Sequence, residues 1–193
     1  MGHSRAEKAE SHERIVQVAS SLFREWGVDG IGVADLMKEA GLTHGGFYRH
    51  FESRDELVAE AVERALADGG RVVVAIGASP LSRKAIVEAL VDGYLSLAHR
   101  DNVATSCAVT TMAGDVSRSN ERARFAYTAQ VEKYLQLLAG LVASDGRTTR
   151  RTKAMAALST LVGAVSMSRA VNDEKLSREI LKSAAREVKA LFA

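Results

Sequence analysis

The chain has 193 residues, 47% of them apolar and 26% charged, a balance that is ordinary for a soluble globular protein. A formal net charge of +2 neither indicates nor excludes nucleic-acid binding. No apolar run approaches the roughly 20 residues of a membrane-spanning helix, and no export signal is found at the start. The single cysteine, Cys107, excludes an internal disulfide. We therefore expect a cytoplasmic protein that does not enter a membrane.

The apolar residues keep helical spacing over long runs and the chain has one proline, which predicts an all-α protein of about nine helices. The first helix is expected over 5–26 and ends at Gly27, a residue that readily adopts the left-handed conformation. Its apolar stripe consists of Ile15, Val18, Ala19, Leu22, Phe23 and Trp26. A short second helix is expected over 33–40, ended by Gly41, and a third over 43–51.

A fourth helix opens with a capping box, "SRDE", from Ser53 to Glu56. Its end is ambiguous, because Gly69 and Gly70 are followed by "RVVVAIGA", which is compatible with a strand on composition alone. The sequence offers no partner strand, so we prefer a buried continuation of the helix.

The later helices follow from their caps and from the apolar spacing. Ser79 and Pro80 are typical of a helix start, and Asp173 is a good N-cap for the last helix. Asp145 and Gly146 are expected to close a long helix. The expected ranges are 79–98, 107–116, 120–143, 148–170 and 173–193.

The short helices within residues 31–51, joined by Gly41 and Leu42, are a helix-turn-helix candidate. In such a motif the second helix lies in the major groove of DNA, and its amino-terminal residues contact base edges. The segment therefore predicts a DNA-binding function.

The expected second helix of this motif has two different faces. At about 100° per residue, Phe47 and Phe51 share one face, and Gly45 and Arg49 lie on the opposite one. Glycine on the outer face would let the helix backbone approach DNA closely. The alternative is that Gly45 and Gly46 belong to a loop.

The stretch "GIGVADLMKEAGLTHGGFYRHFESRDELVAEA", from Gly30 to Ala61, resembles the DNA-binding region of TetR-family transcriptional repressors. The residues that carry the resemblance are Ala40, Gly41-Leu42-Thr43, Phe47-Tyr48, Phe51 and Ser53-Arg54 through Leu57. The resemblance implies a three-helix DNA-binding domain over 1–52 and a helical effector-binding and dimerisation domain over 53–193. It also implies a dimeric, sequence-specific repressor that a small-molecule effector releases from a palindromic double-stranded DNA operator.

The resemblance also implies which residues meet DNA. Phosphate contacts are expected from Thr43, Tyr48, His50 and Arg54. Base or groove contacts are expected from His44, Gly45, Gly46 and Arg49. At the start of the first helix of the motif the family often has Ser or Thr, whereas this chain has Gly32, which caps weakly and has no hydroxyl for a phosphate.

Three of these residues have structural alternatives. Tyr48 is alternatively a core aromatic, and His50 a structural histidine. Arg54 is alternatively a solvated residue at a helix start. Its position at a helix amino terminus, where acidic residues are preferred, favours a phosphate partner.

The last two helices are the expected dimer surface. The segment over 153–171 is rich in small residues around Ala157, Leu161, Gly163 and Val165, which allow close helix approach. The final helix has one apolar stripe of Leu176, Ile180, Leu181, Ala184, Val188 and Leu191. In the TetR family these two helices form a four-helix interface; the alternative is that they only close the core of a monomer.

An effector pocket is expected among the helices between residues 53 and 170. The candidates by residue type are Tyr94, Cys107, Met112, Phe125, Tyr127, Tyr134, Met155 and Met167, each of which is alternatively plain core. Cys107 is a candidate redox or electrophile sensor, but its sequence neighbours include no cation to activate the thiol. No metal-ligand spacing and no phosphate-binding glycine loop is found, so neither a metal nor a cofactor is expected.

Two other functions are alternatives to a ligand-responsive repressor. An architectural DNA-binding protein would have a filled helical domain and no effector. An enzyme would need Cys107 as its nucleophile and a histidine beside it, and His99 is the only histidine after residue 50. The enzyme is the less favoured of the two.

Overall fold

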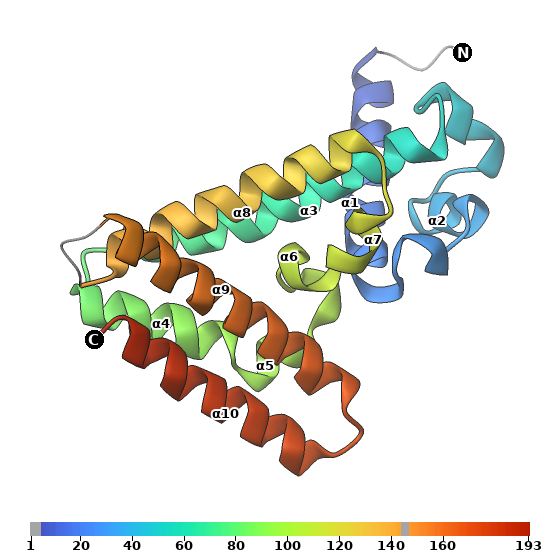
Figure 1. The fold of residues 1–193 in the computed structure, drawn as a ribbon. Coiled ribbons are helices and arrows are strands. Elements are labelled where there is room, and N and C mark those ends of the chain that lie inside the picture. Colours follow the sequence, from blue (N-terminus) through green and yellow to red (C-terminus); the bar gives the residue numbers. More distant parts are fainter. Residues whose placement is uncertain (1–4, 144–146) are drawn as a thin grey trace.

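The computed structural model describes residues 5–143 and 147–193. Over these residues the chain forms ten α-helices and three short 3-10 helices without a strand, which confirms the predicted all-α class (Figure 1). None of the described helices combines the length and the apolar character needed to cross a membrane.

The amino-terminal segment begins with α1 (Arg5–Trp26), as predicted. It continues through η1 (Val28–Gly30) and α2 (Val33–Glu39) to η2 (His44–Arg49). Trp26 does not join the predicted apolar stripe, because its side chain is 62% exposed. Trp26 is the last residue of α1 and lies outside the buried face that contains Ile15 and Phe23.

Gly27 and Gly41 end α1 and α2, as predicted, and both have a positive φ. Gly27 has φ 78° and Gly41 has φ 71°. At Gly41 the main-chain N–H bonds to the Lys38 carbonyl at 2.9 Å, and the N–H of Leu42 bonds to the Met37 carbonyl at 2.9 Å. This pair of bonds is a Schellman motif, and it sets the turn between α2 and η2.

The prediction of an α-helix over 43–51 is wrong in detail, since η2 is a 3-10 helix. The N–H of Gly46 bonds to the Thr43 carbonyl and that of His50 to the Phe47 carbonyl, both at 2.9 Å. These bonds span three residues instead of four. Two adjacent glycines have low α-helix propensity, which favours this short, tighter form.

Helix α3 (Arg54–Gly77) begins at the predicted capping box. Ser53 Oγ accepts from the Glu56 N–H at 3.2 Å, and a Glu56 carboxylate oxygen accepts from the Glu52 N–H at 2.6 Å. The segment "RVVVAIGA" continues this helix, as preferred. Its expected burial is wrong, because Val74 is 59% exposed, Ala75 is exposed as well, and Val73 and Ile76 are only partly buried.

The predicted helix over 79–98 is replaced by α4 (Arg83–Tyr94) and α5 (Leu97–Asp101). Pro80 lies outside both helices, because Ser82 is the N-cap of α4 and accepts from the Ala85 N–H at 3.3 Å. Ser96 ends one helix and starts the next: its hydroxyl donates to the Gly93 carbonyl at 2.8 Å and accepts from the His99 N–H at 3.1 Å.

The expected helix over 107–116 is also divided. The chain passes through η3 (Val103–Thr105) to α6 (Ala108–Thr111) and α7 (Ala113–Ser117). Met112, between the last two, has φ −108° and ψ 4°, which interrupts the helical path. Its side chain is fully buried in the core.

Three long helices complete the fold: α8 (Glu121–Leu141), α9 (Arg147–Ala170) and α10 (Glu174–Leu191). They match the predictions closely, and Asp173 caps α10 as expected. The predicted closing residues Asp145 and Gly146 lie outside the described part of the chain. In Figure 1 α8 runs alongside α3, and α9 and α10 form an antiparallel pair away from the amino-terminal segment.

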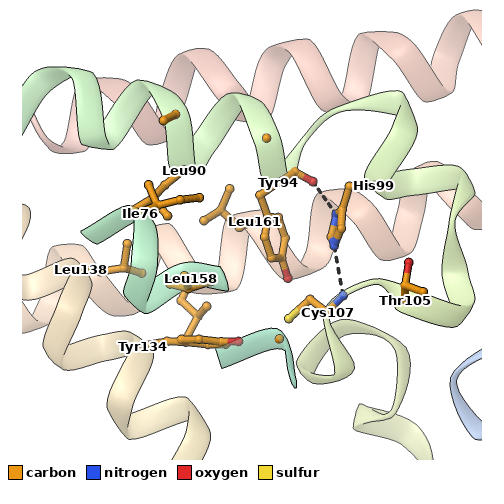
Figure 2. A pocket seen from close by; sticks show the side chains of 14 residues that line it. Ile76, Leu90, Tyr94, His99, Thr105, Cys107, Tyr134, Leu138, Leu158 and Leu161 are labelled. Atoms are coloured by element: carbon orange, nitrogen blue, oxygen red, sulfur yellow. Dashed lines mark hydrogen bonds between the residues drawn. The ribbon is translucent and has the colours of Figure 1, made fainter. Parts of the chain in front are cut away.

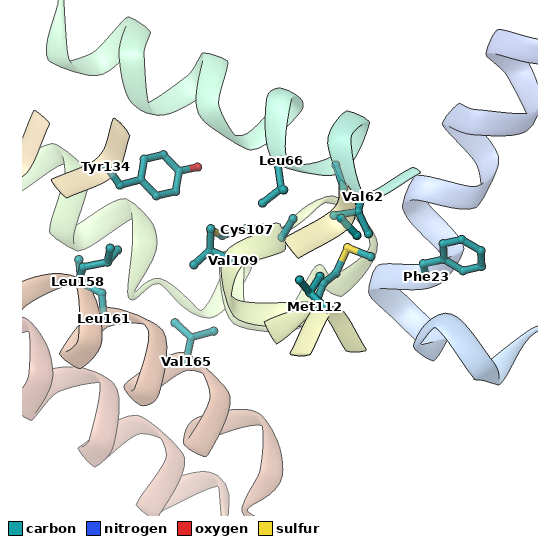
Figure 3. Close-up of a cluster of buried hydrophobic side chains, with 14 of the residues drawn as sticks. Phe23, Val62, Leu66, Cys107, Val109, Met112, Tyr134, Leu158, Leu161 and Val165 are labelled. Atoms are coloured by element: carbon teal, nitrogen blue, oxygen red, sulfur yellow. The ribbon is translucent and has the colours of Figure 1, made fainter. Parts of the chain in front are cut away.

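One hydrophobic core joins the amino-terminal segment to the rest of the molecule. Phe23 from α1 and Met112 approach Val62 and Leu66 from α3 in Figure 3, and the same cluster extends to Val165 in α9. The predicted boundary between residues 52 and 53 stays a prediction, because α3 packs on α1 and on α8 within this core.

The predicted dimer stripe on α9 is wrong as a solvent-facing surface. Ala157, Leu161 and Val165 are buried within the protomer itself, whereas Gly163 is partly exposed. On α10 the predicted single stripe divides in the same way. Leu181, Ala184 and Val188 face the core, and Leu176, Ile180 and Leu191 are exposed or partly so. Residue spacing defines a stripe but not which side of a helix a partner covers.

Candidate functional site

The η2 element presents one buried face and one exposed face, as the helical wheel predicted. Phe47 and Phe51 are both buried, with stacked rings 5.4 Å apart. Tyr48 packs edge-on against Phe47 at 5.3 Å, but its side chain is 75% exposed. The exposed fraction argues against the core alternative for Tyr48 and leaves its hydroxyl at the surface.

The two glycines of η2 differ in their surroundings. A Cβ added to Gly45 would meet no described atom within 4 Å. A Cβ added to Gly46 would lie 3.6 Å from Met37 Cε and 3.7 Å from Thr43 Oγ1, in ordinary contact. Gly45 therefore faces outward, and Gly46 faces α2. Neither Gly45 nor Gly46 has a positive φ, so the backbone conformation does not require glycine at either position.

Other predicted DNA-contacting residues surround Gly45 at the surface. Thr43, His44 and Arg49 are exposed. Gly32 is exposed as well, and it is the N-cap of α2 with its carbonyl accepting from the Leu36 N–H at 3.0 Å.

His50 turns toward the body of the amino-terminal segment. Its ring lies 6.1 Å from that of His12 in α1, and its Nδ1 is buried with no partner among the described residues. Burial, followed by the nearby positive groups, lowers the pKa of His50 from its ordinary value. These contacts fit the structural alternative for this residue.

Arg54 has partners within the chain. Its Nη2 donates to the main-chain oxygens of Val28 at 2.5 Å and of Ile31 at 3.1 Å. The Asp29 carboxylate lies 4.0 Å away. Arg54 therefore ties the start of α3 to the turn before α2, and Nε and Nη1 remain for a further acceptor.

A cavity of about 270 Å³ lies among α3, α4, α8 and α9 (Figure 2). Most of its wall is aliphatic or glycine. The lining residues are Gly69, Val73, Ile76, Ala89, Leu90, Gly93, Tyr94, His99, Thr105, Cys107, Tyr134, Leu138, Leu158 and Leu161. An apolar hollow with a few convergent polar groups is the usual form of a small-molecule site.

The polar groups of the wall gather at one end of the cavity. Figure 2 shows Tyr94, His99, Thr105 and Cys107 together, with Tyr134 directed toward Cys107. The Tyr94 hydroxyl bonds to Thr110 Oγ1 at 2.5 Å. Burial, with a smaller effect from the adjacent Cys107, raises the pKa of both tyrosines, so their hydroxyls keep their protons at neutral pH.

The hydrogen bonds of His99 determine its protonation. Its Nδ1 lies 2.6 Å from the Tyr94 carbonyl oxygen, which only accepts, so Nδ1 carries the proton. The Cys107 main-chain N–H only donates, and it bonds to Nε2 at 3.1 Å, so Nε2 is unprotonated. Burial is the main cause that lowers the pKa of His99, which agrees with a neutral ring.

The structure brings together only part of the predicted pocket. Tyr94, Cys107 and Tyr134 line the cavity. Met112 is in the core, and Tyr127 donates its hydroxyl proton to the Val109 carbonyl at 2.7 Å; neither lines the wall. The remaining candidates are at the surface outside it: Phe125, Met155 and Met167, which are 78%, 42% and 59% exposed.

Most of the wall residues were not predicted from the sequence. Aliphatic residues and glycines have no chemical group that distinguishes a ligand contact from ordinary core. His99 was singled out only as a partner for a catalytic Cys107. The structure does place His99 beside Cys107, but its Nε2 accepts from the main chain and is not free to take the thiol proton. This geometry speaks against the enzyme alternative.

The amino-terminal segment is similar in sequence to known proteins. Residues 15–61 match the sequence model described as "Bacterial regulatory proteins, tetR family". An HTH-type transcriptional regulator of Mycobacterium tuberculosis is 27% identical over 169 residues, 83% of this chain and 85% of the relative. One from Staphylococcus aureus is 36% identical over 62 residues, 32% of this chain and 34% of the relative.

The fold of the whole chain is similar to solved structures. The reduced form of Escherichia coli NemR superposes with a TM-score of 0.80 at 20% identity, over 95% of this chain and 97% of that one. A TetR transcriptional regulator from Chloroflexus aurantiacus gives a TM-score of 0.77 at 23% identity, over 96% and 95% of the two chains. At these identities the likeness concerns the fold.

Proposed function

We propose that the chain, a DNA-binding transcriptional regulator of the TetR family, is a dimeric repressor that a small molecule releases from its operator. The observation that carries the proposal is the exposed outer side of η2. Thr43, His44, Gly45, Tyr48 and Arg49 are all at the surface, while Phe47 within the element and Phe51 just after it are buried.

The proposed DNA contacts divide by chemistry. Tyr48 and Thr43 supply hydroxyls for phosphates, which position the protein without reading bases. Gly45 brings the backbone of η2 close to the base edges, and His44 and Arg49 flank it. Arg54 keeps a phosphate contact through Nε or Nη1 while its Nη2 holds the main chain of the preceding turn. His50 supports η2 from behind.

Dimerisation is proposed through the solvent side of α9 and α10. We call this surface the outer face, and it consists of Met155, Ser159, Gly163, Met167, Leu176, Ile180 and Ser183, all exposed or partly so. Two methionines and a leucine exposed on one pair of helices are typical of a surface that a partner covers. A two-fold axis here would place both η2 elements on one side of the dimer.

The effector is proposed to bind in the cavity among α3, α4, α8 and α9. An architectural DNA-binding protein has no need of a hollow with a mainly aliphatic wall and polar groups at one end. The effector would release DNA by favouring a conformation in which the two η2 elements no longer fit successive major grooves.

A mobility-shift experiment tests the proposal. The DNA is the region upstream of the protein's own gene, with an unrelated fragment of equal length as control. We expect a salt-sensitive complex on the first fragment that survives excess competitor. Equal affinity for both fragments would indicate an architectural protein and contradict the sequence-specific repressor.

A further inference from the structure

The wall of the cavity restricts the kind of molecule that it accepts. We propose that its ligand is a compact, uncharged, largely apolar molecule of roughly ten to fifteen non-hydrogen atoms with a hydroxyl or carbonyl group at one end. The inference deepens the proposed function and rests on it for the biological role of the cavity as the effector site.

The described wall of the cavity offers no counter-charge to an ionic ligand. Among the described residues, the wall contains no lysine, arginine, aspartate or glutamate. Arg169 lies close to His99 of the wall, but its Nε and Nη2 donate to the main-chain oxygens of Arg100 and His99, both at 2.8 Å. A carboxylate or ammonium group in the cavity would lose its hydration without gaining an ion pair, which is strongly unfavourable.

His99, the imidazole among the described wall residues, has no free ring nitrogen. Both ring nitrogens are occupied by main-chain partners, the Tyr94 carbonyl and the Cys107 N–H. The ring is therefore neutral and has no position from which to bind an anion. Tyr94 and Tyr134 also stay neutral, since burial raises the pKa of each.

Polar and apolar side chains lie at opposite ends of the cavity. The hydroxyls of Tyr134 and Thr105 and the thiol of Cys107 lie at one end, as Figure 2 shows. Ile76 and Leu138 lie at the other. A ligand with one hydrogen-bonding group would place it at the polar end and bury its hydrocarbon part among the aliphatic side chains.

Size sets the last limit. A cavity of about 150 Å³ holds benzene, and the pockets of drug-sized ligands have about 300–1,000 Å³. This cavity, at about 270 Å³, lies between the two. A fused two-ring aromatic alcohol is a suitable probe of this size.

Two small residues leave the cavity open on the side of α4. Ala89 and Gly93 belong to its wall and are also exposed. A Cβ on Gly93 would meet no described atom within 4 Å, so a side chain can begin there without a clash. Gly140 is a matched control, because it is exposed, has equally open surroundings, and is likewise the second-last residue of its helix.

The experiment measures direct binding to the full chain without DNA. Isothermal titration calorimetry at neutral pH compares 2-naphthol with 2-naphthoate and 2-naphthylmethylammonium, which share one ring system and differ in charge. We expect 2-naphthol to bind at least tenfold more tightly than either ion. Equal or tighter binding of an ion overturns the proposal, and so does the absence of binding by all three probes.

The glycine variants locate the binding. Gly93→Leu is expected to weaken 2-naphthol binding at least tenfold, and Gly140→Leu to leave it unchanged, with circular dichroism confirming that both are folded. Equal affinities in the two variants would place the probe elsewhere and overturn the proposal.

A mobility-shift experiment with 2-naphthol distinguishes a failure of the proposed ligand class from a failure of the proposed function. If the probe binds in the cavity and the operator complex persists, the effector function fails and the ligand class stands. If operator binding is specific but only charged probes bind, the ligand class fails and the DNA-binding function stands.

Discussion

The Arg24 guanidinium donates from Nη1 to the main-chain oxygen of Ser106 at 3.2 Å, across 82 positions of sequence. Arg24 lies near the end of α1, and its Nε also donates to the Ser20 carbonyl at 2.9 Å. Ser106 directly precedes Cys107, which lines the cavity. A buried hydrogen bond therefore joins α1, which packs on α2 of the proposed helix-turn-helix, to the wall of the proposed effector site.

Replacing this arginine tests the connection. Arg24→Met keeps much of the buried volume but leaves the Ser106 oxygen without a partner, so the free energy of unfolding should fall by about 1–3 kcal/mol. Urea denaturation measures the change. Arg124→Met, at an exposed position of α8, is the control. Equal stabilities of the two variants would show that the Arg24 hydrogen bond contributes little.

Gly45→Leu should abolish operator binding and preserve the fold. Its Cβ enters open space on the outer side of η2, so the core is undisturbed, but the side chain would collide with the base edges. We expect the affinity for operator to fall to the non-specific level, about 10³-fold or more. Fluorescence anisotropy and thermal unfolding measure the two properties. Retained affinity, or a large fall in melting temperature, would contradict the outward assignment.

Tyr48→Phe and Arg54→Ala should both weaken binding to all DNA sequences alike, because both residues are assigned to phosphates. The tyrosine change should not affect stability, since the ring is exposed. The arginine change should also lower the free energy of unfolding, by about 1 kcal/mol, because two main-chain carbonyls lose a donor. Binding to operators with single base changes measures the specificity, and a loss confined to one base position would refute the phosphate assignment.

Gly163→Arg should separate the proposed dimer. A Cβ at Gly163 meets no described atom within 4 Å, so the protomer tolerates the substitution, whereas the outer face would gain an unpaired charge. Gly140→Arg, at an open position on α8, is the control. Sedimentation should show monomers only for the first variant. A Gly163→Arg dimer with unchanged operator affinity would place the partner surface elsewhere.

The stability of the protein should decrease as pH falls below the ordinary histidine pKa of 6.5, because burial lowers the pKa of both His99 and His50 in the folded chain. Over this range the unfolded chain binds protons that the folded chain does not. The stabilisation is present above 6.5 and is lost as pH falls toward the folded values. The charge of Arg169 acts on His99 in the same direction.

His99→Gln should remove part of this pH dependence, since His50 remains. Urea denaturation at neutral and mildly acidic pH measures the slope. An unchanged slope in the variant would mean that protonation of His99 does not contribute.

Local features of the sequence were sufficient for most helix boundaries. Capping by Ser53 and Asp173, and positive-φ turns at Gly27 and Gly41, depend on interactions within a few residues, so they can be recognised in the sequence alone. The same holds for the two faces of η2. The resemblance to the TetR family added the expected DNA-binding role. The match of residues 15–61 to the tetR-family sequence model supports this expectation.

The tertiary structure determined which neighbours cover each apolar face, which helical periodicity alone does not specify. An apolar stripe shows that a helix has a buried side, but only packing decides whether Leu161 meets its own protomer or a partner, and whether Phe125 is core or surface. The cavity depends on four helices from distant parts of the chain. Its aliphatic wall has no sequence signature, and the neutrality of His99 follows from main-chain partners at Tyr94 and Cys107. Such contacts arise from the folded arrangement, because no local pattern specifies which main-chain groups a buried side chain will meet.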